Sequence, residues 1–394
     1  SNLIYLLLEA QIFNEKMDDR RVNLLVFEEP EAHLHPQMEN IFIRYISAIN
    51  KAVIMDTKSE VSEIVELVEV AEVLEVAEEV AKEAEVAAAE VATAPATEPV
   101  VLGEHNVPFQ MLITTHSIEM TKVIGLKNIR VLRSNGHIES KVFDLNNFIN
   151  SPDIDRKFYE KFFQFNMVEM VFADKLILFE GDAERLLFKY LISNMRKYEN
   201  LSSQYISYIQ VGGAYAHKYL DLISFLEIKT LTFTDIDYKY EKEDIEKDTD
   251  LILEEIVKRE TTNETIKKIV GESIISEIFK IAKEKQGEFL NNSKMCLKFQ
   301  TDIDGYARTL EDALLHKLLN VETVFSKITK EDFEIIIKNK QLLLSNTNKS
   351  ETTLRDRIEK LKNKTDFMYA LIESGNINNA IPNYIEEGLD WLKD

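Results

Sequence analysis

The sequence predicts an α/β protein with parallel strands, and three features lead to this fold class. Short apolar runs alternate with helical segments across short links, most regularly over residues 175–234. These apolar runs are continuous, as in buried strands. Several runs end in acidic residues, which places carboxylates at strand ends, where α/β sheets usually bind ligands.

The composition is that of a globular protein in a reducing environment. The 394 residues are 45% hydrophobic, enough for two or three domains. The one cysteine, Cys296, excludes an intramolecular disulfide framework. The apolar run near the start is too short to span a bilayer and lacks the layout of a signal peptide. We therefore expect a cytoplasmic protein with no membrane partner.

An acidic low-complexity segment occupies residues 56–107. Its 14 acids and two lysines supply 12 of the 22 net negative charges, so the remaining charge is mild enough to allow a nucleic-acid partner. Between Glu60 and Glu78 a glutamate recurs every third residue, a period that fits neither a strand nor an α-helix. We expect an insertion that needs no packed core, with an acidic arm for a basic partner as the alternative.

Two units are predicted around and after this insertion, residues 1–150 and 151–394. The first unit is predicted to hold strands at 22–27, 110–115, 129–133 and 140–145 and a helix at 36–49. In the second unit, strands at 175–179, 205–211 and 229–234 alternate with helices at 183–196 and 215–226. The remainder is predicted to be mostly helical, apart from a strand at 296–300.

The first predicted strand ends in two adjacent acids, Glu28 and Glu29, within LLVFEEPEAHLHPQ (24–37). In nucleotide-hydrolysing folds, one such acid holds the Mg²⁺ hydration shell and the next activates the attacking water. The strand in LITTHS (112–117) ends close to His116, which could contact a γ-phosphate. These three residues are therefore candidates for catalysis and nucleotide binding. His33 and His35 are interpreted as loop residues rather than metal ligands.

These motifs resemble the ABC-type ATPase heads of the RecF, SMC and OLD (overcoming lysogenisation defect) families. The resemblance makes EEPEAHLHPQ the Walker B motif with its D-loop and makes His116 the switch histidine. No GxxxxGK[ST] loop occurs in the sequence, so the Walker A motif is absent. We expect the C-terminal part of an ABC-type ATPase domain, a missing N-terminal ATPase half, and little ATP binding by this chain alone.

A second group of acids follows the strands of the second unit. Glu180 directly follows strand 175–179, and Asp235 and Asp237 lie at the end of strand 229–234. If these strands are parallel neighbours, their carboxylates meet at one edge, and two aspartates on an extended chain point the same way. Oxygen donors without Cys or His select Mg²⁺ or Mn²⁺ over zinc.

Glu180-Gly181 followed by the DxD pair resembles the TOPRIM fold of topoisomerases, primases and OLD-family nucleases. The segments 171–188, 211–220 and 233–238 resemble OLD-type TOPRIM domains in particular. The resemblance implies two Mg²⁺ or Mn²⁺ ions, the first held by Glu180, Glu184, Asp235 and Asp237. It further implies that Thr309 and Glu311 help to hold the second ion and that Lys364 stabilises the phosphate. Asp312 is a weaker candidate, which we expect at the surface.

The resemblance covers residues 1–55 and 108–394 and implies a metal-dependent DNA endonuclease that hydrolyses phosphodiester bonds, similar to the ATPase–nuclease subunits of Gabija-type anti-phage systems. It implies regulation by ATP, a role in anti-phage defence or DNA repair, a homo-oligomer and a helicase-like partner. One alternative is a non-catalytic RecF- or SMC-like DNA-binding ATPase with a structural TOPRIM unit. A topoisomerase or primase ranks last, because no nucleophilic-tyrosine domain or polymerase framework fits the sequence.

Overall fold

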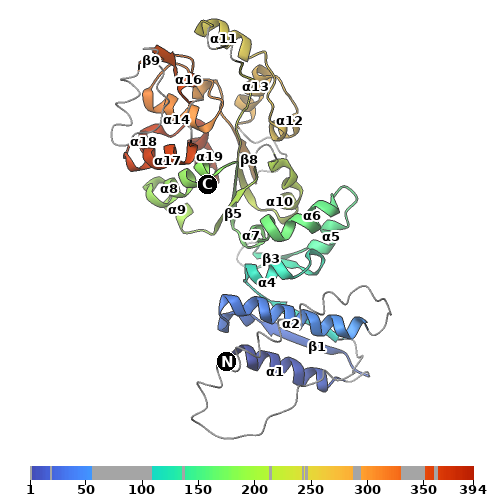
Figure 1. The fold of residues 1–394 in the computed structure, drawn as a ribbon. Helices are drawn as coiled ribbons and strands as arrows, with labels where there is room; N and C mark the ends of the chain where they lie inside the picture. The colour runs from blue at the N-terminus through green and yellow to red at the C-terminus, as the bar shows by residue number, and fades with distance from the viewer. Residues whose placement is uncertain are drawn as a thin grey trace. The chain divides into compact units, whose positions relative to one another are not determined.

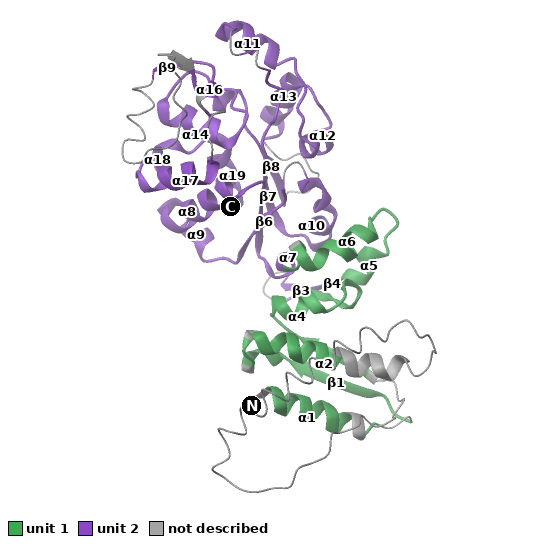
Figure 2. Ribbon diagram, viewed as in Figure 1, with its two compact units in different colours: residues 1–131, 144–168 green, residues 132–143, 169–394 purple. Residues whose placement is uncertain are grey.

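The computed structural model of the chain contains two compact units (Figure 2). They comprise residues 1–131 with 144–168, and residues 132–143 with 169–394. The predicted insertion at 56–107 lies outside the described residues, and the predicted boundary at residue 150 stays a prediction. The structure describes residues 2–17, 20–55, 109–134, 138–212, 215–241, 244, 247–286, 294–329, 351–358 and 363–394.

The first unit is built on two parallel strands, β1 (Asn23–Glu28) and β2 (Phe109–Thr114), that pair along their whole length. Both lie within one residue of their predicted positions. They share a hydrophobic core with α1 (Asn2–Glu15) and α2 (Pro36–Met55). The core residues are Ala10, Phe27, Phe42, Ile43, Ile46 and Met120.

Short elements complete the first part of the chain. Ser117, Asp144 and Asp155 each cap the helix that follows by accepting a backbone N–H, which explains where these helices begin. A two-stranded sheet joins β3 and β4. The elements are η1 (Pro30–His33), α4 (Ile118–Val123), η3 (Leu126–Asn128), β3 (Arg130–Ser134), β4 (Ser140–Asp144), α5 (Leu145–Ile149), α6 (Arg156–Phe162), the π-helical η4 (Phe163–Met167) and α7 (Val168–Phe172).

The second unit contains a four-stranded parallel sheet in the order β6-β5-β7-β8. The predicted parallel strands are therefore confirmed, and the α/β fold class with them. Every residue from Leu176 to Phe179 is buried, as the continuous apolar run predicts. The strands are β5 (Lys175–Phe179), β6 (Ile206–Gln210), β7 (Lys229–Phe233) and β8 (Met295–Lys298).

Helices lie on both sides of this sheet, with α8, α17 and α19 on one side and α10 and α12 on the other (Figure 1). The C-terminal part is mostly helical, as predicted, with one small antiparallel pair, β9 and β10. The elements are α8 (Asp182–Asn194), η5 (Arg196–Tyr198), α9 (Glu199–Ser202), η6 (Ala216–Lys218), α10 (Leu220–Leu226), α11 (Thr249–Ile256), α12 (Glu264–Val270), α13 (Ile275–Lys285), η8 (Asp302–Asp304), α14 (Leu310–Leu319), β9 (Lys327–Thr329), β10 (Glu351–Thr353), α16 (Leu354–Ile358), α17 (Lys364–Glu373), α18 (Ile377–Ala380) and α19 (Asn383–Lys393). Among the described residues, no helix is both long enough and apolar enough to cross a bilayer.

Gly388 allows α19 to pack directly on β7. A Cβ atom at this position would lie 2.8 Å from Cζ of Phe233, whose ring is stacked on Phe188 with 4.5 Å between centroids. Because Phe233 has no room to retreat, we expect Gly388→Val to lower the free energy of unfolding by about 2 kcal/mol in thermal denaturation. Gly125→Val is the matched control, since its Cβ would meet nothing closer than 4.0 Å. Equal melting temperatures for the two variants would contradict this packing.

Candidate metal-dependent nuclease site

The parallel pairing of β5 with β7 brings Glu180 and Asp235 together. Glu180 directly follows β5, and Asp235 comes two residues after β7, at the same edge of the sheet. The backbone N–H of Asp235 donates to Oε1 of Glu180 at 3.2 Å. The hydroxyl of Thr234 donates to the same oxygen. The two strand-end acids, which are 55 residues apart in the sequence, therefore lie in direct contact.

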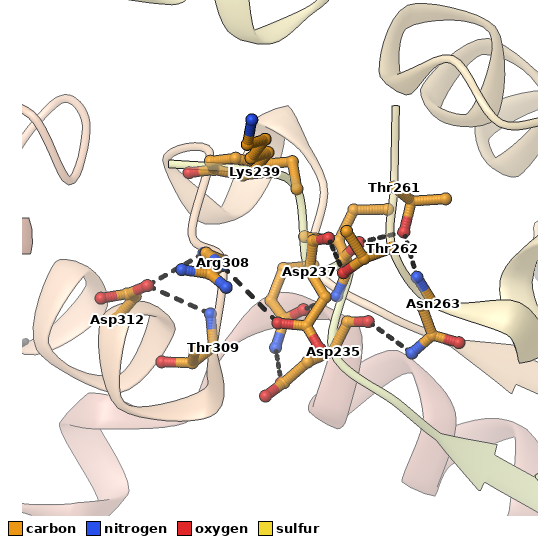
Figure 3. Close-up of polar contacts among 12 residues, drawn as sticks. Asp235, Asp237, Lys239, Thr261, Thr262, Asn263, Arg308, Thr309 and Asp312 are labelled. Atoms are coloured by element: carbon orange, nitrogen blue, oxygen red, sulfur yellow. Dashed lines mark hydrogen bonds and ion pairs between the residues drawn. The ribbon is translucent and has the colours of Figure 1, made fainter. Parts of the chain in front are cut away.

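Asp235 and Asp237 face different neighbours. Oδ1 of Asp235 accepts a hydrogen bond from Nε2 of Gln300 at 2.7 Å, whereas Oδ1 of Asp237 lies 3.6 Å from Nε of Arg308 (Figure 3). The expectation of an extended chain through both aspartates is wrong, because β7 ends at Phe233 and Asp237 has a φ of 44°. Asp tolerates this left-handed conformation better than most residues.

Glu311 and Lys364 bring to the same region an ion pair between a buried carboxylate and a half-exposed ammonium group. Glu311 lies in the first turn of α14 and is 2% exposed, and its Oε2 is 2.9 Å from Nζ of Lys364, the first residue of α17. Glu184 lies in the first turn of α8. A Cβ atom at Gly181 would lie 3.1 Å from Oε2 of Glu184, so this glycine leaves room for the carboxylate.

We refer to five side chains as the acidic cluster: Glu180, Glu184, Asp235, Asp237 and Glu311. Burial raises the pKa of each of the first four, and it raises the pKa of Glu184 to about 7. For Asp235, repulsion from the other four carboxylates raises the pKa further. The acids are therefore close enough to repel one another.

Lys364 carries the counter-charge of this region. Burial opposes its charge, but the ion pair with Glu311 and the nearby Asp235 and Glu184 outweigh that effect and raise the pKa of Lys364. The lysine is thus held protonated beside the acidic cluster. A fixed ammonium group in this position can interact with an anionic substrate.

Thr309 and Asp312 form the capping box at the start of α14. Oδ2 of Asp312 accepts from the backbone N–H groups of Arg308 at 3.0 Å and Thr309 at 3.1 Å, and it pairs with Arg355. Asp312 is fully buried, so the expectation of a surface position is wrong. Its burial is possible because the guanidinium neutralises its charge.

The donor chemistry of the acidic cluster fits a hard divalent cation. Its donors are all oxygens, and a cation would stabilise the ionised carboxylates against the burial and the repulsion that raise their pKa values. Within the described ranges, however, no three Asp, Glu, His or Cys side chains are arranged to hold a metal ion. The acids are thus brought together without forming a closed ligand cage.

The other predicted site residues lie in the first unit. Glu28 ends β1 and is exposed, and Glu29 follows it with a φ of 43°. Oε1 of Glu29 lies 3.1 Å from Nε2 of His116, which follows β2. The backbone N–H of Glu29 donates to the carbonyl of Thr114 at 2.9 Å. The parallel pairing of β1 and β2 therefore brings the predicted Walker B acid and switch histidine into contact.

The sequence did not point to several residues that contact the acidic cluster, among them Arg308, Thr234, Asn263 and Gln300. One feature of the sequence could have marked Thr234 as a site residue, namely its position directly before the DxD pair. Asn263 could have been interpreted only as the residue that caps α12, because its other contacts come from distant parts of the sequence. Gln300 is the last residue of the strand predicted at 296–300, and no sequence pattern marks it as a site residue.

Residues 171–237 match the family described as "Overcoming lysogenization defect protein-like, TOPRIM domain". This segment is therefore similar to OLD-like TOPRIM domains. The matched range contains Glu180, Glu184, Asp235 and Asp237 of the acidic cluster, whereas Glu311 comes from outside it. The predicted resemblance to OLD-type TOPRIM domains is thereby confirmed.

Comparison over the whole chain gives a relative that is named as an endonuclease. Across 420 aligned residues the chain is 27% identical to Endonuclease GajA of Bacillus cereus (strain HuB5-5), and it spans about half (52%) of that relative's length. Two solved structures are similar to this chain, each over 57% of its length. They are the C-terminal region of the Burkholderia pseudomallei OLD protein (20% identity, TM-score 0.30, 98% of that chain) and the C-terminal region of the Xanthomonas campestris pv. campestris OLD protein (20% identity, TM-score 0.28, 95% of that chain).

Proposed function

We propose that this OLD-like chain is a metal-dependent DNA endonuclease that hydrolyses phosphodiester bonds in the cytoplasm. The observation that carries the proposal is the contact between Glu180 and Asp235 at the sheet edge, within a group of repelling carboxylates. A cluster of this kind would be costly to keep without a cationic ligand. The relative named as an endonuclease supports the same assignment.

Two Mg²⁺ or Mn²⁺ ions fit the proposed chemistry. Glu180, Glu184, Asp235 and Asp237 would hold one ion, and Glu311 with Thr309 would help to hold the other. When bound, such ions supply an activated water and stabilise charge on the phosphate and leaving oxygens.

The protein's own groups bind and orient the DNA phosphate. Nζ of Lys364 lies 2.9 Å from Glu311 and keeps its proton, so it can donate to a non-bridging phosphate oxygen. Nε of Arg308 lies 3.6 Å from Oδ1 of Asp237 and offers a second cation. The two cations offset part of the negative charge of the five carboxylates and favour an anionic substrate over a neutral one.

The first unit would link this nuclease to a nucleotide. The contact between Glu29 and His116 next to Glu28 is consistent with the ATPase half-site that the sequence predicts. ATP binding would need a Walker A motif, and no GxxxxGK[ST] loop occurs in the sequence. Homo-oligomerisation, a helicase-like partner and a role in anti-phage defence or DNA repair belong to the same proposal.

Cleavage of supercoiled plasmid tests the proposed function. The chain should nick plasmid DNA in Mg²⁺ or Mn²⁺, and Asp235→Ala should abolish nicking because it removes a central carboxylate of the acidic cluster. Asp250→Ala, which changes an exposed acid in α11, is the control and should leave nicking unchanged. Nicking that survives Asp235→Ala would defeat the assignment, and relaxation without nicks would indicate a topoisomerase.

A further inference from the structure

Two buried amide side chains hold the strand-end carboxylates of the acidic cluster. Asn263 is 1% exposed and Gln300 is fully buried. Each donates a hydrogen bond to Asp235, Asn263 to its backbone carbonyl at 2.9 Å and Gln300 to its Oδ1 at 2.7 Å. Figure 3 shows Asn263 beside Asp235. Neither amide can ionise, so each can act on the acidic cluster only through the orientation of its N–H donors.

The orientation of Asn263 is fixed by the helix that it caps. Its Oδ1 accepts from the backbone N–H groups of Thr265 at 2.9 Å and Ile266 at 3.1 Å, in the first turn of α12. The amide nitrogen must therefore face the other way. There it donates to Oγ1 of Thr234 at 2.6 Å and lies 3.4 Å from Oε1 of Glu180.

The orientation of Gln300 is fixed in the same way. Its Oε1 accepts from the backbone N–H of Ile236 at 2.9 Å, so its Nε2 faces Asp235 and the hydroxyl of Tyr384, the latter at 3.2 Å. A flipped amide would place an oxygen against the carboxylate of Asp235 and leave the N–H of Ile236 unpaired. The surrounding hydrogen bonds therefore fix Gln300 as a donor to Asp235.

These donors occupy one oxygen of each carboxylate. Within the described part of the chain, the three hydrogen bonds to the Glu180 side chain all end on Oε1, and the one to the Asp235 side chain ends on Oδ1. Each acid therefore offers its second oxygen to a ligand. Binding a cation through both oxygens would displace buried donors from Oε1 of Glu180, and at Asp235 it would compete with Gln300 for Oδ1, and both effects cost free energy.

We propose that Gln300 and Asn263 are positioning residues that restrict Asp235 and Glu180 to one-oxygen coordination and so favour Mg²⁺ or Mn²⁺ over Ca²⁺. Mg²⁺ demands a compact octahedral shell, whereas Ca²⁺ accepts more oxygens and binds carboxylates through both. The inference rests on the proposed function, since it assumes that the acidic cluster holds a divalent cation.

Calorimetric titration with Mn²⁺ and with Ca²⁺ tests this inference without any cleavage assay. Gln300→Met keeps the side-chain length and removes the donor, and it should weaken Mn²⁺ binding about tenfold while weakening Ca²⁺ binding much less. Asn263→Ser retains an oxygen that caps α12 but loses the amide N–H groups, and it should change the Mn²⁺ to Ca²⁺ preference in the same direction. Asn263→Ser preserves the cap of α12 and should fold. It therefore tests whether the buried amides set the preference for Mn²⁺ over Ca²⁺ even if Gln300→Met fails to fold.

Gln204→Met is the matched control. Gln204 precedes β6, at the opposite end of the sheet, and donates to the carbonyl of Asn200 at 3.1 Å. It should bind both ions as the wild type does. Unchanged affinities in the folded Gln300 and Asn263 variants, or equal losses for Mn²⁺ and Ca²⁺, would overturn the inference. A wild-type protein that binds no Mn²⁺ would instead overturn the proposed function itself.

Discussion

Asp235→Asn should raise the melting temperature of the metal-free protein while lowering cleavage by about a factor of 10³. The amide has the size of the carboxylate, and its oxygen can still accept the hydrogen bond from Gln300 that Asp235 accepts at 2.7 Å. The change removes a charge that four neighbouring carboxylates repel. Relief of about 1–2 kcal/mol corresponds to roughly 3–6 °C in a unit of this size.

Thermal denaturation in EDTA near pH 8 and plasmid nicking in Mg²⁺ provide the two measurements. Asp237→Asn is the matched control for the stability effect, because Asp237 has Arg308 at 3.6 Å and loses an attraction together with the repulsion. It should gain less stability than Asp235→Asn. If Asp235→Asn lowered both the melting temperature and the activity, Asp235 would be a structural residue and the interpretation of the acidic cluster would be wrong.

The sequence predicts the sheet well because its signals are local. The apolar run of β5 ends in polar residues on both sides, and the predicted range 175–179 is the observed strand. The helices between the strands favour parallel pairing, whereas the sequence left it as a condition that β5 and β7 are neighbours, which the structure shows them to be. The prediction that Glu180 and Asp235 approach each other rested on this topology alone.

The environment of the acidic cluster could not be predicted, because it comes from distant segments. Gln300 reaches Asp235 across 65 residues of sequence, and Asn263 reaches it across 28. Asp312 was expected at the surface because nothing nearby in the sequence marks Arg355 as its partner, 43 residues away. Side-chain burial of this kind depends on tertiary packing, which a single sequence does not encode in any local pattern.

The turn through Asp237 was missed for a different reason. A DxD pair after a strand predicts an extended backbone, because polar residues spaced two apart are typical of a strand. The chain instead leaves β7 at Phe233, and the backbone carbonyl of Asp237 accepts from the N–H of Thr262 at 2.8 Å and from its hydroxyl at 2.7 Å. A long-range contact thus overrides the local preference and turns Asp237 toward Arg308.

The metal-free protein should be more stable near pH 5.5 than near pH 8. Glu184 has a pKa of about 7 in the folded state against an ordinary value of 4.5, so between these values the folded protein binds a proton that the unfolded chain does not. Stability from this group therefore falls as the pH rises toward 7 and beyond. Between pH 5.5 and 8 the difference is about 2 kcal/mol, or roughly 4–8 °C in melting temperature.

Two further measurements assign this dependence to the acidic cluster. In Glu184→Gln the difference in melting temperature between the two pH values should shrink, because the amide does not titrate. In the wild type, excess Mg²⁺ should raise the melting temperature more near pH 8 than near pH 5.5, since protons compete with the cation for the carboxylates. An unchanged pH dependence in Glu184→Gln would show that Glu184 ionises normally and stands apart from the repelling carboxylates. An equal effect of Mg²⁺ at both pH values would mean that the cation binds elsewhere.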